Sequence, residues 1–179
     1  MTLSAFKAAS PSGPALEIVS GGVPVDKKLA HGELTGLAEM PYLFGLAYYA
    51  GEFSGINRLY SLFNSFSTKL ANKKKWNIAN PGTLEKASQI ALDMHLYPQH
   101  YSLCKSCRGS GSQKRGKVCN HCHGTGTKPI TDAQLAYQLG ISRSNMQRTW
   151  SNRLNILYTE AQALHAIINN HLKYRNKVA

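Results

Sequence analysis

Helical periodicity, one cysteine-rich segment and a glycine-containing turn between two short apolar runs together predict a mainly α fold for this 179-residue chain. We expect a helical N-terminal unit, a four-cysteine zinc-finger insertion, and a helix-turn-helix followed by a long C-terminal helix. The expected segments are a flexible N-terminal arm at 1–25, a helical unit at 26–100, a zinc-binding segment at 101–129, the helix-turn-helix at 130–155 and the C-terminal helix at 156–179.

The N-terminal half is expected to form three helices after the arm, which is rich in Ser, Gly and Pro. An apolar stretch at 34–53 predicts a helix that breaks or begins near Pro41. Apolar residues at helical spacing predict a second helix, which ends at the run Lys73–Lys75. A third helix, capped by Thr83, is expected to stop at Pro98. We expect the aromatic side chains of this half to form a core rather than a ligand pocket.

All four cysteines lie in one segment, as two Cys-x-x-Cys pairs separated by eleven residues. Each pair continues as Cys-x-Gly-x-Gly, and glycine allows the chain to pass close to sulfur and reverse at least steric cost. Two such pairs supply the four thiolates of a tetrahedral structural zinc site. The segment therefore predicts one structural Zn²⁺ held by Cys104, Cys107, Cys119 and Cys122.

Two disulfides or four free thiols are the other interpretations of these cysteines. A cytosolic setting opposes the disulfides, and the paired spacing opposes the free thiols. His121 and His123 flank Cys122, and either could replace a cysteine as a ligand. Four thiolates close the coordination sphere and leave no position for a reactive water. Residues 111–118, between the pairs, hold three cations and no acid. These cations are either phosphate contacts or solvated side chains: Lys114, Arg115 and Lys117.

The pattern of a DNA-binding helix-turn-helix follows the cysteines. Thr131 or Asp132 can cap a first helix, whose core positions are Leu135, Ala136 and Leu139. Gly140 permits a sharp turn, Ile141 fills the angle between the helices, and Ser142 can cap the second helix. The alternative is a helical corner with a purely structural role. An apolar stripe then predicts the long C-terminal helix, at Met146, Trp150, Leu154, Leu157, Ala161, Leu164 and Ile168.

The second helix of this motif is expected to carry the side chains that contact bases. In such motifs its N-terminal residues enter the major groove, where guanidinium and amide groups bond to purine edges. We expect base contacts from Arg143, Ser144 and Arg148, with further DNA contacts from Asn145, Gln147 and Asn152. Arg153 is expected to contact phosphate, with plain solvation as the alternative.

The charge distribution agrees with a polyanionic partner. The net charge is +12, and residues 101–179 hold twelve of the 21 Lys and Arg residues but only two of the nine acids, Asp132 and Glu160. That half therefore carries +10, whereas residues 1–100 carry +2. A solubilising surface charge is the simpler interpretation.

Two classes of protein are disfavoured by the absence of long apolar runs. No run approaches the ~20 residues of a membrane helix, so we expect no membrane contact. The N-terminus shows no continuous apolar stretch typical of a secretory signal, which predicts a cytoplasmic location.

The zinc and helix-turn-helix segments resemble the late-gene antitermination proteins Q of lambdoid bacteriophages, in the lambda-type branch. The resemblance lies in Cys104–Gly111, in Cys119–Gly126 and in the run Arg148–Ser151, and it covers about residues 100–160. It implies that the four cysteines hold zinc and that Arg143, Ser144 and Arg148 contact a DNA element.

The resemblance also implies a transcription antitermination mechanism in the host bacterial cytoplasm. Such proteins bind double-stranded DNA at a phage late promoter and engage paused bacterial RNA polymerase holoenzyme through the sigma factor and the β-subunit flap. The modified polymerase then passes pauses and terminators. We expect the polymerase-facing surface in the helical N-terminal half.

Three other function classes share part of this pattern. A helix-turn-helix repressor or activator that stays on its operator has the same motif. The zinc domain of J-proteins also contains Cys-x-x-Cys-x-Gly-x-Gly, but in four copies against the two here. An enzyme that processes DNA needs carboxylates to hold metal ions, and the basic half has only Asp132 and Glu160. The sequence also lacks a GxxxxGK[ST] or HExxH motif, so we expect no enzymatic activity.

Overall fold

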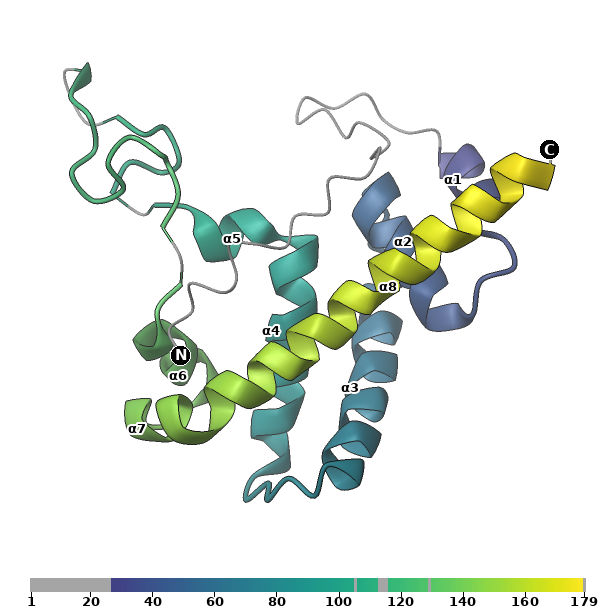
Figure 1. Cartoon of the computed structure of the whole chain (residues 1–179). Helices are drawn as coiled ribbons and strands as arrows, with labels where there is room; N and C mark the ends of the chain where they lie inside the picture. Colours follow the sequence, from purple (N-terminus) through teal and green to yellow (C-terminus); the bar gives the residue numbers. More distant parts are fainter. Residues whose placement is uncertain (1–26, 105, 113–115, 129, 179) are drawn as a thin grey trace. The chain divides into compact units, whose positions relative to one another are not determined.

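The computed structural model describes residues 27–104, 106–112, 116–128 and 130–178, which form two compact units (Figure 1). Of the described residues, one unit contains those from 97 to 151, and the other contains 27–96 together with 152–178. The described part is mainly helical, and its β structure is limited to two isolated bridges, Leu103 with Thr127 and Ser112 with Val118. The arm expected at 1–25 lies outside the described residues.

Four helices of the N-terminal half, one more than the three expected, and most of a long C-terminal helix make up the helical unit. They are α1 (Lys27–Leu34), α2 (Glu39–Ala50), α3 (Ile56–Lys73), α4 (Pro81–Leu96) and α8 (Ser151–Val178). α3 and α4 are antiparallel neighbours joined by a short turn. Pro41 stands in the first turn of α2, where a missing N–H costs no helical hydrogen bond, so the helix begins near Pro41 as predicted.

The cap predicted for α4 is wrong. Thr83 is buried inside the first turn, and the helix begins two residues earlier at Pro81. Proline fits the first helical position because its φ is already helical and its missing N–H would have no partner there. The Asn80 side chain accepts a hydrogen bond from the N–H of Gly82 at 2.9 Å. Asn80 therefore provides the capping hydrogen bond that was expected from Thr83.

The predicted apolar stripe on α8 forms the centre of the helical unit. Leu154, Leu157, Ala161, Leu164 and Ile168 are all buried, as are Phe44 of α2 and Phe63 of α3. α8 contacts the other elements of this unit along its length. His95 of α4 donates to the Tyr158 carbonyl at 3.1 Å, His165 packs edge-on against Phe44, and Arg175 donates to the Gly32 carbonyl.

The other unit contains the cysteines and a set of short helices. α5 (Pro98–Ser102) precedes the cysteine segment, and α6 (Asp132–Leu139), α7 (Arg143–Asn145) and a five-residue π-helical turn, η3 (Met146–Trp150), follow it. The apolar spacing predicts regular α-helix over Met146–Trp150, and the π turn corrects that prediction. Ser151 accounts for it locally, since its N–H and its hydroxyl both donate to the Met146 carbonyl five residues earlier.

Candidate metal centre and nucleic-acid interface

The four cysteine sulfurs form a compact buried cluster that could hold a metal ion. All four Sγ atoms lie within 4.8 Å of one another, with 3.9 Å between Cys104 and Cys119 and 3.6 Å between Cys107 and Cys122. A disulfide needs about 2.05 Å, so these thiols are unbonded. A tetrahedron of sulfurs about 2.3 Å from a central ion has edges of about 3.8 Å, which matches the observed spacing.

An internal two-fold pattern holds the cluster together. The two Cys-x-x-Cys-x-Gly-x-Gly repeats are offset by fifteen residues, and their backbone hydrogen bonds correspond one to one. Cys104 N–H donates to the Gly126 carbonyl and Cys119 N–H donates to the Gly111 carbonyl, both at 2.9 Å. The two β-bridges are related by the same offset. The first cysteine of each repeat is therefore hydrogen-bonded to the last glycine of the other repeat. The sequence repeat alone did not reveal this arrangement.

Backbone N–H groups in the two Cys-x-x-Cys turns favour the thiolate form of Cys104 and Cys119, but not that of Cys122. The N–H groups of Cys107 and Ser106 lower the pKa of the Cys104 thiol, although its burial acts against them. Burial would raise the pKa of Cys119, but the N–H groups of Cys122 and His121 and the neighbouring thiols bring it down to about 7. Burial raises the pKa of Cys122, despite the N–H of Gly126 that donates to its sulfur at 3.2 Å.

His121 and His123 do not belong to the cluster. Both are exposed, and among the described residues the group able to hold a metal consists of the four cysteines. The backbone of His123 has a φ of 51°, as does that of Arg108 at the same place in the first repeat. These two residues therefore turn the chain after the second cysteine of each pair.

Two glycines in the repeats are predicted to be irreplaceable for steric reasons. A Cβ on Gly111 would overlap the Gly124 carbonyl, and a Cβ on Gly126 would overlap the Gly109 carbonyl. Gly111→Ala should therefore lower the affinity for metal and destabilise the segment by more than the ~1–2 kcal/mol expected from a left-handed backbone alone. Metal competition with a chromophoric chelator measures the first effect.

Gly116→Ala is the matched control for this prediction. Gly116 has the same φ of 71° as Gly111, yet nothing lies within 4 Å of the position its Cβ would take. Gly116→Ala should lose only the stability that a side chain in a left-handed backbone conformation costs. Equal losses in the two variants would contradict the steric explanation.

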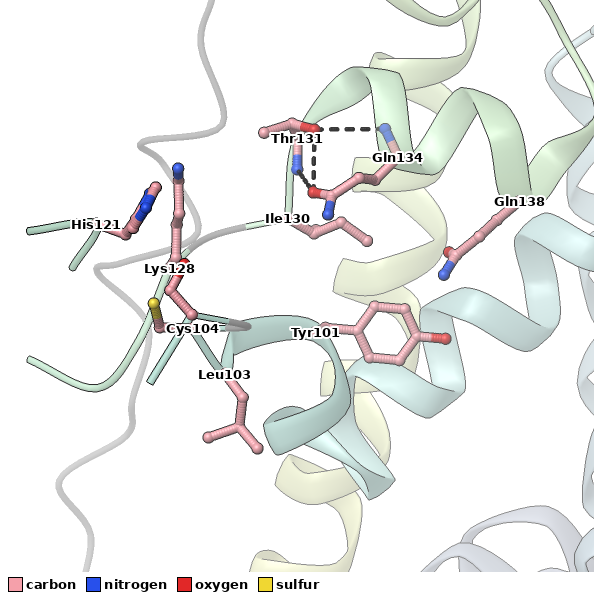
Figure 2. A pocket seen from close by; sticks show the side chains of 10 residues that line it. Tyr101, Leu103, Cys104, His121, Lys128, Ile130, Thr131, Gln134 and Gln138 are labelled. Atoms are coloured by element: carbon pink, nitrogen blue, oxygen red, sulfur yellow. Dashed lines mark hydrogen bonds between the residues drawn. The ribbon is translucent and has the colours of Figure 1, made fainter. Parts of the chain in front are cut away.

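The turn predicted between the two helices after the cysteines has the expected local geometry. Thr131 caps α6 in a reciprocal capping box with Gln134, seen as dashed lines in Figure 2. Gly140 takes a left-handed φ of 68°, and the Ser142 hydroxyl accepts from the Asn145 N–H at 3.2 Å to cap α7. Five predicted core positions are buried: Leu135, Ala136, Leu139, Met146 and Trp150. Ile141, which was expected to fill the angle between the helices, is only half-buried.

The side chains predicted to contact DNA lie at or after this second helix. Arg143, Ser144, Asn145, Gln147, Arg148 and Asn152 are all exposed. Arg148 reaches back one turn, and its Nη2 donates to the Ser144 hydroxyl at 3.1 Å. Two of the expected base-contacting residues are thus held together before any ligand binds.

The predicted phosphate contacts divide into three cases. Lys117 is exposed, and Lys114 and Arg115 lie outside the described residues. Arg153 is only half-exposed, because its guanidinium lies 5.5 Å from the centre of the Trp76 ring and Nη1 donates to the Asn77 carbonyl at 3.1 Å. The sequence did not predict the contact between Arg153 and Asn77, because 76 residues separate the two.

A pocket of about 330 Å³ lies between the cysteine segment and α6 (Figure 2). Lys128 and His121 line one side, and Tyr101 and Gln138 line the other. No carboxylate is among its described lining residues, so the paired acids of a hydrolytic or phosphoryl-transfer site are absent there.

A second feature missed by the sequence analysis is an aromatic and histidine cluster in the helical unit. His165 lies between Phe44 and Tyr48 at ring-centre distances of 4.8 and 4.3 Å, and His95 stacks on Tyr158 at 4.2 Å. The aromatic residues were predicted as core. The two histidines were not, because a single His at a helical position carries no sequence pattern.

Comparison of the chain with protein-family models, curated proteins and solved structures finds no match. Among the described residues, none of the helices has both the length and the apolar character needed to cross a membrane.

Proposed function

We propose that this protein is a sequence-specific double-stranded DNA-binding transcription factor of the antitermination type, with one structural Zn²⁺. The observation that carries the DNA-binding part is the capped helix pair α6–α7, continued by η3, with exposed polar side chains at Arg143, Ser144, Asn145, Gln147 and Arg148. A helix presented by such a turn fits the major groove, and its guanidinium and amide groups have the geometry for base edges. The basic balance of residues 101–179 supplies attraction to phosphate.

The proposed zinc has a structural role. Cys104, Cys107, Cys119 and Cys122 would hold it, and their spacing fits Zn–S bonds. Cysteine-rich four-sulfur sites favour zinc over hard cations, which prefer oxygen ligands. One equivalent of zinc per chain is expected in protein purified without chelators.

The antitermination part of the proposal rests on the resemblance to the lambdoid Q proteins. It is tested by transcription from a late-promoter template with a terminator downstream, using bacterial RNA polymerase holoenzyme. We expect the protein to raise the fraction of full-length transcript and to require its DNA element. Specific DNA binding without any change in termination would support the alternative, a helix-turn-helix repressor or activator.

Arg148→Ala tests the proposed mode of DNA contact. We expect a loss of about 1–3 kcal/mol of binding free energy and a weaker preference at one base position. Fluorescence anisotropy with single-base variants of the duplex measures both. Lys173→Gln, which removes an exposed cation on α8, is the control and should leave the base preference unchanged. An equal loss on every duplex would make Arg148 a phosphate contact.

A further inference from the structure

The turn between α3 and α4 carries the densest group of positive charge in the helical unit. Lys73, Lys74 and Lys75 are consecutive and exposed, and none of the three forms an ion pair among the described residues. No acid occurs anywhere between Glu52 and Glu85. We call residues 73–77, which include Trp76 and Asn77, the lysine turn.

The backbone of the lysine turn is hydrogen-bonded to the end of α3 and has an unfavourable conformation at one lysine. Trp76 N–H donates to the Ala71 carbonyl and Lys75 N–H to the Asn72 carbonyl, which is the Schellman arrangement that closes a helix. Lys75 occupies the position where glycine is usual, with a φ of 51°. A side chain is strained in this left-handed conformation, so the third lysine is present despite a conformational penalty.

Arg153 fixes the lysine turn to the beginning of α8. Its guanidinium stacks on Trp76 and its Nη1 bonds to the Asn77 carbonyl, two contacts from one planar group. The turn and Arg153 thus form one surface with four cations. Stabilisation of the C-terminal end of α3 would explain one or two lysines, but not the exposed third one or the attachment to Arg153.

We propose that the lysine turn and Arg153 bind the sugar–phosphate backbone of the same DNA duplex that α7 contacts, an inference that rests on the proposed function. Arg153 follows Arg148 by five residues, and five residues cannot span more than about 18 Å in any conformation. A duplex turn is about 34 Å long, so Arg153 is within reach of phosphates about half a turn from the bases that Arg148 would contact, and the lysine turn adjoins Arg153 through Trp76 and Asn77. Lysine point charges on this surface suit phosphate and carry no base preference.

The test is the salt dependence of duplex binding by the full chain. Lys73→Gln/Lys74→Gln removes two charges and leaves the conformation of Lys75 untouched. Each lost phosphate contact should reduce the slope of log K against log salt by about 0.9, or about 1.8 in total. A fourfold rise in salt should therefore weaken the wild type about 12-fold more than the variant, equally on the specific and on a scrambled duplex.

Two further variants make the result interpretable. Lys86→Gln/Lys173→Gln removes two exposed charges elsewhere in the helical unit and should keep the wild-type slope. Lys73→Arg/Lys74→Arg keeps the charge and should also keep the slope, so a folding defect in the glutamine variant is separated from a lost contact. Equal slopes for the glutamine variants at both places would overturn the inference.

The outcomes also separate this inference from the proposed function. If the wild-type protein binds no duplex, both the inference and the proposed function are wrong. Normal DNA binding by Lys73→Gln/Lys74→Gln together with lost terminator read-through would make the lysine turn a protein-binding surface, which overturns the inference and leaves DNA binding by α7 intact.

Discussion

Cys119→Ser is expected to unfold the cysteine segment, residues 103–127, while the helical unit stays folded. In the described part of this segment, the buried hydrophobic side chains are the four cysteines themselves, so no other core remains once the metal is lost. Structural zinc contributes on the order of 10 kcal/mol in such small segments. The expected result is loss of bound metal together with rapid hydrogen exchange in peptides from 103–127 and unchanged exchange in α3 and α4.

His121→Ala is the control for this prediction, since His121 is exposed beside Cys122 and lies outside the cluster. It should keep one equivalent of metal and the wild-type exchange pattern. A Cys119→Ser protein that still holds a full equivalent would show that a histidine completes the site. A protected, metal-free segment would refute the structural role of the ion.

The helical unit is expected to lose stability as the pH falls from about 6.5 to about 4. Burial, and to a lesser extent the neighbouring His95, lowers the pKa of His165 from 6.5 to about 4. The unfolded chain then binds a proton that the folded chain excludes, so the stabilisation is complete above pH 6.5 and is lost toward pH 4. A difference of about 2.5 pKa units corresponds to about 3 kcal/mol. Burial lowers the pKa of His95 as well, which acts in the same direction.

The measurement is hydrogen exchange of α4 and α8 peptides between pH 4 and 7.5, corrected for the intrinsic pH dependence of exchange. Exchange in these peptides reports the helical unit even if acid releases the metal. His165→Leu should flatten the pH dependence, because the aliphatic side chain stays neutral between Phe44 and Tyr48. His121→Ala should keep the wild-type pH dependence. An unchanged profile in His165→Leu would assign the acid sensitivity to other groups.

Local patterns were predicted well wherever neighbouring residues decide the structure. The caps at Thr131 and Ser142 and the left-handed turn at Gly140 were predicted and are confirmed, because each depends on hydrogen bonds within four or five residues. The α8 stripe was predicted because burial on one side of a helix leaves a regular spacing. Thr83 was predicted wrongly, because Pro81 and Thr83 both suit a helix start and Asn80 was not weighed as a cap.

The candidate sites show the same difference between features set by neighbouring residues and features set by distant segments. The sequence identified the four cysteines as one group, and the structure brings their sulfurs together. The sequence did not reveal the hydrogen bonds that each cysteine repeat donates to the other, the π turn at Met146–Trp150 or the stacking of Arg153 on Trp76. These depend on contacts between segments or on a small balance of hydrogen bonds, and neither leaves a periodic pattern.

By itself, the sequence determined the helical class, the four candidate metal ligands, both ends of α6 and the beginning of α7, because periodicity, ligand spacing and capping are properties of short stretches of chain. Only the tertiary structure decided that each cysteine repeat is closed by the other and that two histidines are enclosed by aromatic rings. It also decided that the lysine turn is attached to α8. Contacts across 22, 70 or 76 residues depend on how the packed helices and the two cysteine repeats place distant groups, and free energy of burial rather than local conformation selects them.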